Sequence, residues 1–166
     1  MKVTFGGNEV NLVGKEIKVG DMAPEFKAVN LDLSDFSSKD NLGKVVVYSV
    51  VPSVDTGVCS IQTTNFNEEA GKLGDDVRIV TVSVDLPFAQ ERFCSAKGIE
   101  NSTIVSDYRW KDFGNKYGFL IDELQLLTRG IVIVDKEGKV AYVEYVPEVT
   151  NEVNFDKALE VVKSLI

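Results

Sequence analysis

Two cysteines, Cys59 and Cys94, are the residues of this chain most suited to covalent chemistry. The 166 residues contain no histidine. That absence excludes Ser-His-Asp and Cys-His catalysis, the usual zinc sites and haem held by histidine. Two thiols so far apart provide neither a zinc site nor a disulfide-stapled scaffold. The sequence therefore predicts no metal and no cofactor, and any nucleophile must be activated without an imidazole base.

The residues before Cys59 place it at the start of a helix. Residues 44–51 (KVVVYSVV) are nearly all β-branched or aromatic, as in a buried strand, and Pro52 ends this run. Helical periodicity begins near Thr56. Free backbone N–H groups and the positive end of the helix dipole stabilise a thiolate in a first turn. Cys59 is thus a candidate nucleophile, although a small buried hydrophobe explains its position alone equally well.

Three segments resemble a known family. The pattern Pro52-x-x-x-Thr56-x-x-Cys59 is similar to the active-site motif of the peroxiredoxins. The segment SVDLPFAQERFC, which ends at Cys94, resembles the resolving-cysteine segment of their thiol peroxidase subfamily, an atypical 2-Cys type. Arg129 precedes a predicted strand, where that family carries its active-site arginine. The resemblance covers nearly the whole chain and implies a thioredoxin-like α/β fold with an N-terminal β-hairpin extension.

The resemblance also implies a reaction and its partners. Cys59 would attack a hydroperoxide and become a sulfenic acid, which condenses with Cys94 to an intramolecular disulfide. Thioredoxin would restore the dithiol, and the chain would form a homodimer. In the same scheme Pro52 shields the thiolate from bulk water.

Thiol acidity explains only part of the rate that such chemistry needs. A cysteine with a pKa of about 8.5 is already a few per cent thiolate at neutral pH, so complete ionisation gains only about thirtyfold. Any larger acceleration must come from polar groups aimed at the breaking O–O bond. We assign that role, and peroxide binding, to Arg129, to the Thr56 hydroxyl and to the backbone N–H groups of Val58 and Cys59.

Disulfide formation makes a geometric demand. A disulfide needs Cα atoms within about 7 Å of each other. Cys59 and Cys94 are predicted on separate helices, which do not readily meet that limit while both are intact. The sequence therefore predicts local unwinding around Cys59, Cys94 or both in each cycle.

Two other functions remain open at this stage. A thioredoxin-like disulfide exchanger shares the fold class, but it would ordinarily need a C-x-x-C pair, and position 62 is Gln62. A redox sensor without enzymatic activity would need only the two thiols and could have the same sequence. Taken alone, Cys94 could be a buried helix position and Arg129 a surface ion-pair partner.

The elements expected to position these residues alternate between strands and helices before a hairpin and a final helix. Residues 3–19 predict a small hairpin that turns at 6–8. The remaining expected strands are 44–51, 77–84, 103–106, 130–134 and 139–146, and the expected helices are 56–73, 87–97, 112–117 and 154–166. Parallel βαβ units followed by an antiparallel hairpin indicate the thioredoxin-like arrangement.

Composition excludes several function classes. The chain is 44% hydrophobic and carries a net charge of −8, with 26 acidic and 18 basic residues. No cluster of basic residues offers a surface for nucleic acid or for an anionic membrane. No apolar run approaches the ~20 residues that span a bilayer. We therefore expect one domain over residues 1–166, located in the cytoplasm.

Overall fold

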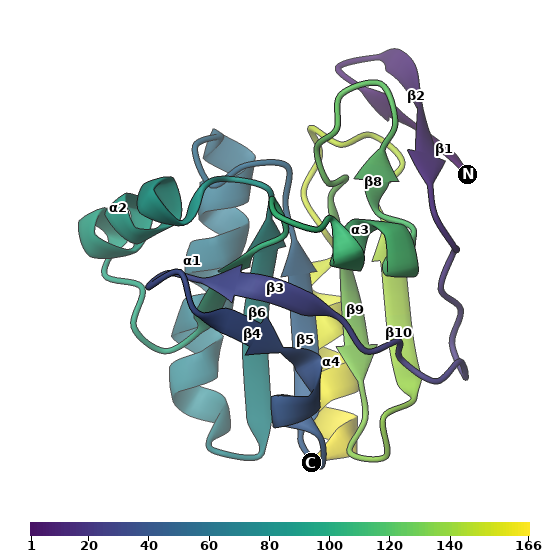
Figure 1. Cartoon of the computed structure of the whole chain (residues 1–166). Helices are drawn as coiled ribbons and strands as arrows, with labels where there is room; N and C mark the ends of the chain where they lie inside the picture. Colours follow the sequence, from purple (N-terminus) through teal and green to yellow (C-terminus); the bar gives the residue numbers. More distant parts are fainter.

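A seven-stranded mixed sheet is the frame of the computed structural model, which describes residues 1–166 (Figure 1). Its strands are β3 (Lys27–Asn30), β4 (Asp35–Ser37), β5 (Val45–Val50), β6 (Val77–Ser83), β7 (Thr103–Ser106), β9 (Gly130–Val134) and β10 (Val140–Tyr145). They are ordered β10-β9-β5-β6-β7-β3-β4, with β5, β6 and β7 parallel and β9 antiparallel to β5. A smaller sheet is formed by β1 (Lys2–Phe5), β2 (Asn8–Val13) and β8 (Leu120–Ile121).

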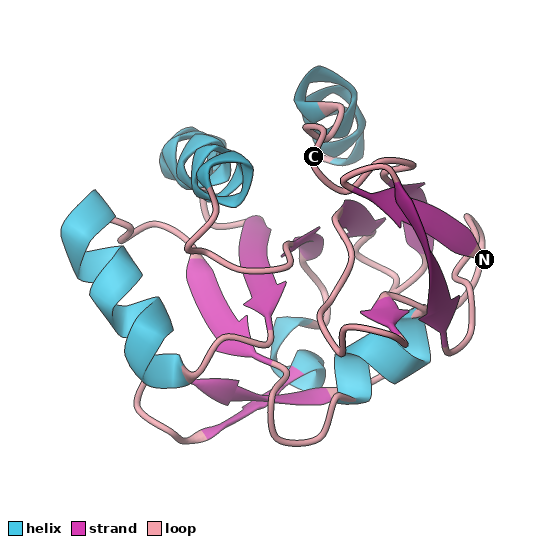
Figure 2. Cartoon of the chain, turned by 90° about the horizontal axis from the view of Figure 1, so that it is seen from above, coloured by secondary structure: helices cyan, strands magenta, loops and turns pink.

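The helices cover both faces of the large sheet (Figure 2). They are η1 (Ser38–Asn41), α1 (Gly57–Leu73), α2 (Pro87–Lys97), α3 (Asp112–Tyr117) and α4 (Phe155–Leu165). Helices α1 and α4 pack on one face through Phe66, Ala158 and Val162, while α3 packs on the other through Phe113 and Tyr117. None of the helices combines the length and the apolar character needed to cross a membrane.

The expected thioredoxin-like architecture is confirmed, and most element boundaries agree within two residues. Three short strands, β3, β4 and β8, were not predicted, because they have only two to four residues and depend on partners elsewhere in the chain. The N-terminal hairpin is shorter than expected: its second strand ends at Val13 rather than near Val19. The short helix α3 forms although it contains Gly114, where a Cβ would lie 2.8 Å from Leu127 Cδ2.

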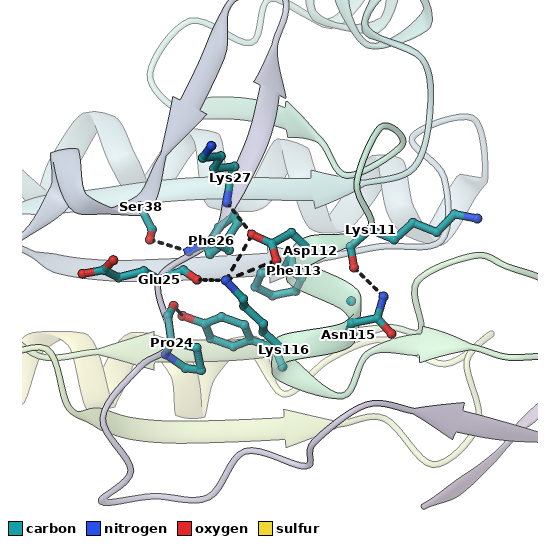
Figure 3. Close-up of polar contacts among 12 residues, drawn as sticks. Pro24, Glu25, Phe26, Lys27, Ser38, Lys111, Asp112, Phe113, Asn115 and Lys116 are labelled. Atoms are coloured by element: carbon teal, nitrogen blue, oxygen red, sulfur yellow. Dashed lines mark hydrogen bonds and ion pairs between the residues drawn. The ribbon is translucent and has the colours of Figure 1, made fainter.

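Polar contacts fasten α3 to the segment that leads into β3 (Figure 3). The ammonium group of Lys116 donates a hydrogen bond to the backbone oxygen of Glu25 at 2.7 Å and pairs with Asp112 at 3.2 Å. The Asp112 carboxylate also accepts the backbone N–H of Lys27 at 2.8 Å. These contacts hold α3 against the segment that enters β3.

A buried carboxylate fixes the N-terminal turn of α3. Asp107 follows β7, is 1% exposed, and accepts the backbone N–H groups of Phe113 and Gly114 at 2.9 and 2.8 Å. Its own N–H donates to the carbonyl of Ser83, which ends β6. Burial raises the pKa of Asp107 from 3.8 to about 6, against the lowering effect of the two N–H donors.

The folded protein should therefore lose stability as the pH rises through the range set by Asp107. Its folded pKa of about 6 lies above its unfolded value of 3.8, so between these pH values only the folded state keeps the proton. The free energy of unfolding should fall by about 2 kcal/mol from pH 4 to pH 7 relative to Asp107→Asn, which does not titrate. Urea unfolding of both proteins across this range measures the difference. A difference independent of pH would contradict the prediction.

Candidate active site

The first turn of α1 presents Cys59. Strand β5 ends at Val50, and the buried Pro52 lies in the loop that follows it. Helix α1 begins at Gly57, so Cys59 is the third residue of the helix. Thr56 is the N-cap, and its hydroxyl oxygen accepts the backbone N–H of Cys59 at 3.3 Å. The side chain of Cys59 is fully buried. A thiolate at this position lies at the positive end of a 17-residue helix.

Arg129 reaches the sulfur from the strand that neighbours β5. It immediately precedes β9, is only 2% exposed, and donates from Nη2 to Cys59 Sγ at 3.0 Å. Its Nε donates to the carbonyl of Val149 at 2.7 Å. It takes part in none of the ion pairs of the structure. The structure thus places Arg129 beside the sulfur rather than at the surface.

Gln62 orients the guanidinium and was missed as a site residue by the sequence analysis. It lies almost one helical turn after Cys59, is 4% exposed, and its Oε1 accepts from Arg129 Nη1 at 3.0 Å. Its Nε2 donates to Ser49 Oγ at 2.8 Å, which fixes the direction of the amide. A buried amide on the face of α1 that carries Cys59 was the available signal. Sequence analysis used this position only to exclude a C-x-x-C pair.

The remaining predicted residues of the first motif surround the same turn. Pro52 is buried where β5 gives way to the loop. Val58 is the second residue of α1, where a backbone N–H has no partner inside the helix. The Thr56 hydroxyl bonds the backbone of Cys59 and donates weakly to the carbonyl of Ser53 at 3.4 Å. Of the two backbone donors assigned to peroxide, the Val58 N–H is therefore the one not engaged by the cap.

Cys94 lies on α2, and it is not bonded to Cys59. Both cysteines pack against one small apolar cluster formed by Val51, Val54, Phe93, Ile99 and Ile104. Cys94 is half-buried and near the C-terminal end of its helix. Burial, helped by the negative charge of Glu91, raises the pKa of the Cys94 thiol. Cys94 is thus held as a neutral thiol, in contrast with the cationic surroundings of Cys59.

A hollow of about 430 Å³ lies between the N-terminal turn of α1 and helix α2. Thr56, Gly57 and Ser60 line it from α1 and the cap, and Phe93 and Ala96 line it from α2. Cys59 does not line it, because the first turn covers the sulfur. A small molecule in this hollow would lie beside the turn that carries Cys59.

Comparisons with known proteins identify the family. The family model described as Redoxin matches residues 18–160. The chain belongs to the redoxin family. The thiol peroxidase of Bacillus subtilis (strain 168) is 50% identical over 165 residues, which cover 99% of this chain and 98% of that protein. A thiol peroxidase of Oceanobacillus iheyensis is 52% identical over 157 residues, 95% of each chain. This redoxin is accordingly a thiol-dependent peroxidase, as the sequence motifs predicted.

A solved structure agrees with this assignment. A peroxiredoxin-like protein from Aquifex aeolicus superposes with a TM-score of 0.93 at 46% identity, covering 99% of this redoxin and 97% of that chain. The thiol peroxidase from Chromobacterium violaceum is only 20% identical and superposes with a TM-score of 0.87 over 99% of this redoxin and 96% of that chain. The latter comparison shows that the fold is retained at low identity.

Replacing Gln62 should slow the attack on peroxide more than it weakens the fold. Gln62→Leu leaves Arg129 Nη1 without its acceptor, and a hydrogen bond to a charged group contributes about 1.5–3 kcal/mol, so we expect a rate constant about tenfold lower. The rate of Cys59 oxidation by hydrogen peroxide, measured in a Cys94→Ser background, isolates this step. Glu68→Gln, an exposed change on the same helix, is the control. An unchanged rate with a lowered urea midpoint would restrict Gln62 to a packing role.

Proposed function

We propose that the enzyme reduces hydrogen peroxide and organic hydroperoxides through Cys59, with Cys94 as the resolving thiol and thioredoxin as the reductant. The observation that carries this proposal is the 3.0 Å contact between Arg129 Nη2 and Cys59 Sγ in a buried setting. A buried cation supports both an anionic sulfur and the negative oxygen that forms when an O–O bond breaks. The active-site roles of Pro52 and Thr56 belong to the same proposal.

The first step transfers one oxygen. The Cys59 thiolate attacks the terminal oxygen of ROOH, an S–O bond forms, and the O–O bond breaks. The sulfur is oxidised to a sulfenic acid that keeps the hydroxyl proton, and the peroxide is reduced to RO⁻, which takes a proton from water. Arg129, bonded to the sulfur already, is placed to donate to the peroxide oxygens, and the Val58 N–H is a second donor at the same turn.

The second step joins the two cysteines. The Cys94 sulfur attacks the sulfenic sulfur of Cys59, an S–S bond forms, and the hydroxyl leaves as water with the thiol proton. Thioredoxin then supplies two electrons and two protons, so the disulfide returns to two thiols while the thioredoxin dithiol becomes a disulfide. The raised pKa of Cys94 supports this division of roles, because a neutral thiol does not compete for peroxide.

A change of local structure accompanies the second step in this proposal. Cys59 is covered by the first turn of α1, and Cys94 lies on intact α2, with the apolar cluster packed against both. Unwinding of one or both turns would expose the sulfurs to each other. The hollow between the helices gives such a rearrangement room.

A homodimer in the cytoplasm completes the proposal. Leu86, Phe88 and Trp110 are exposed by 53%, 66% and 41%, and they follow neighbouring strands β6 and β7 at one edge of the sheet. Burial of such apolar side chains supports a contact between two copies near the active site. A reducing compartment suits an enzyme whose cycle depends on two free thiols.

The rival functions differ in one measurable respect. A redox sensor needs only two thiols, whereas the buried Arg129 and the Gln62 that orients it favour turnover. A disulfide exchanger would carry its second cysteine at position 62, where Gln62 holds Arg129 instead. Repeated turnover of peroxide separates an enzyme from a sensor.

Peroxide consumption by the wild type, Cys59→Ser and Cys94→Ser, with thioredoxin and its reductase, tests the cycle. We expect Cys59→Ser to be inactive, since it lacks the nucleophile. Cys94→Ser should consume one equivalent and then stop, because its sulfenic acid has no resolving thiol. A wild type no faster than a free thiol would refute the peroxidase cycle and favour the sensor. Sedimentation equilibrium of the same samples tests the dimer.

A further inference from the structure

One carboxylate outside the proposed catalytic set joins the two cysteine-bearing regions. Asp85 lies between β6 and α2, and its Oδ1 accepts from Ser53 Oγ at 2.7 Å. Its Oδ2 accepts the backbone N–H of Val54 at 2.9 Å and Ser83 Oγ at 2.7 Å. Asp85 takes part in no ion pair, so these three donors are the partners of its carboxylate.

Two of the three donors belong to the loop that carries the cap of α1. Apart from Asp85, the loop is held to the sheet by the N–H of Val51, which donates to the carbonyl of Val82. Its other bonds are internal: the Asp55 N–H donates to Ser53 Oγ at 3.1 Å, and the N–H and hydroxyl of Thr56 donate weakly to the carbonyl of Ser53 at 3.4 Å. Hydrogen bonds to an ionised carboxylate are roughly twice as strong as neutral ones. Asp85 is therefore the main polar anchor of the middle of this loop. Its partner Ser53 lies three residues before Thr56 and six residues before Cys59.

The same network continues into the helix of the second cysteine. Ser83 Oγ, which donates to Asp85, accepts from Gln90 Nε2 at 3.0 Å. Gln90 is fully buried on α2, about one helical turn before Cys94, and Nε2 also donates to the carbonyl of Val105. A path of three hydrogen bonds thus runs from the loop before Cys59 through Asp85 and Ser83 to α2.

We propose that Asp85 is a positioning residue that stabilises the peroxide-reactive arrangement of Cys59 over the arrangement in which Cys59 and Cys94 join. This inference rests on the proposed function, because it concerns the balance between the two steps of that cycle. An anchor that is made in only one of two conformations shifts their equilibrium by its own free energy. Weakening Asp85 should therefore slow oxidation of Cys59 and speed disulfide formation.

Asp85→Asn is the direct variant, because an amide keeps the shape of the side chain but turns one acceptor into a donor toward the loop. Ser53→Ala is a milder variant that removes one donor and leaves the carboxylate in place, so it serves where Asp85→Asn does not fold. Asp76→Asn, in the exposed turn at the opposite end of β6, is the charge-matched control.

Single-turnover rapid-quench mass spectrometry with hydrogen peroxide measures both rate constants, for sulfenic acid and for disulfide. For Asp85→Asn we expect about tenfold slower Cys59 oxidation and faster disulfide formation from the sulfenic acid, as loss of one charge-assisted hydrogen bond would give. Ser53→Ala should change both constants in the same directions by smaller factors. Adding Ser53→Ala to Asp85→Asn should have little further effect, because both remove the same bond.

Opposite changes in the two constants distinguish positioning from a general loss of structure. If both rate constants fall together in Asp85→Asn, or if neither differs from its value in Asp76→Asn, the positioning role of Asp85 is overturned while the proposed function stands. A wild type that oxidises Cys59 without forming the disulfide would overturn the second step of the proposed function and this inference with it.

Discussion

A guanidinium buried without a carboxylate partner is the constraint on which the site depends. Removing a charge from water costs several kcal/mol unless other groups compensate. Arg129 is satisfied by the carbonyl of Val149, the amide oxygen of Gln62 and the sulfur of Cys59. Among these three, only the sulfur can carry a full negative charge. A negative charge on that sulfur would offset the cost of burying Arg129, and the proposed function makes use of this pairing.

The sheet explains how residues 70 positions apart meet. Strands β5 and β9 are antiparallel neighbours, and Val50 at the end of β5 pairs with Gly130 at the start of β9. The residues just beyond these ends, Pro52 and Arg129, therefore lie at one edge. Strand β10 comes so close to Gly130 that a Cβ there would clash with the carbonyl oxygen of Glu144. Glycine after Arg129 is thus required by packing.

Local sequence patterns predicted the parts of the molecule that local physics determines. The β-branched runs of β5, β6 and β9 and the Pro87 start of α2 need little information from elsewhere, and their boundaries agree with the structure. Strands β3, β4 and β8 are too short to carry a periodic signal, because their pairing supplies most of their stability. The position of Cys59 in the first turn was likewise predicted from the helix start.

Contacts between residues far apart in the sequence could not be predicted from local sequence patterns. Only the family resemblance brought Arg129 to Cys59, since neither residue reveals the register of β5 and β9. Gln62 bonds to Arg129, and Asp85 bonds to the loop before α1, and nothing in their neighbours along the chain predicts these distant partners. The two backbone bonds of the Thr56 hydroxyl, to Cys59 and to Ser53, were also not predicted.

The most direct test of the Arg129–Cys59 contact compares two reactions of the same sulfur. In a Cys94→Ser background, Arg129→Lys keeps the positive charge but loses the fork of N–H donors. The account predicts that oxidation of Cys59 by hydrogen peroxide slows by about a hundredfold or more, while alkylation by iodoacetamide changes by only a few-fold, because only the first reaction breaks an O–O bond that the fork stabilises. Equal slowing of both reactions would contradict it, since Arg129 would then act only through the charge or the exposure of the sulfur.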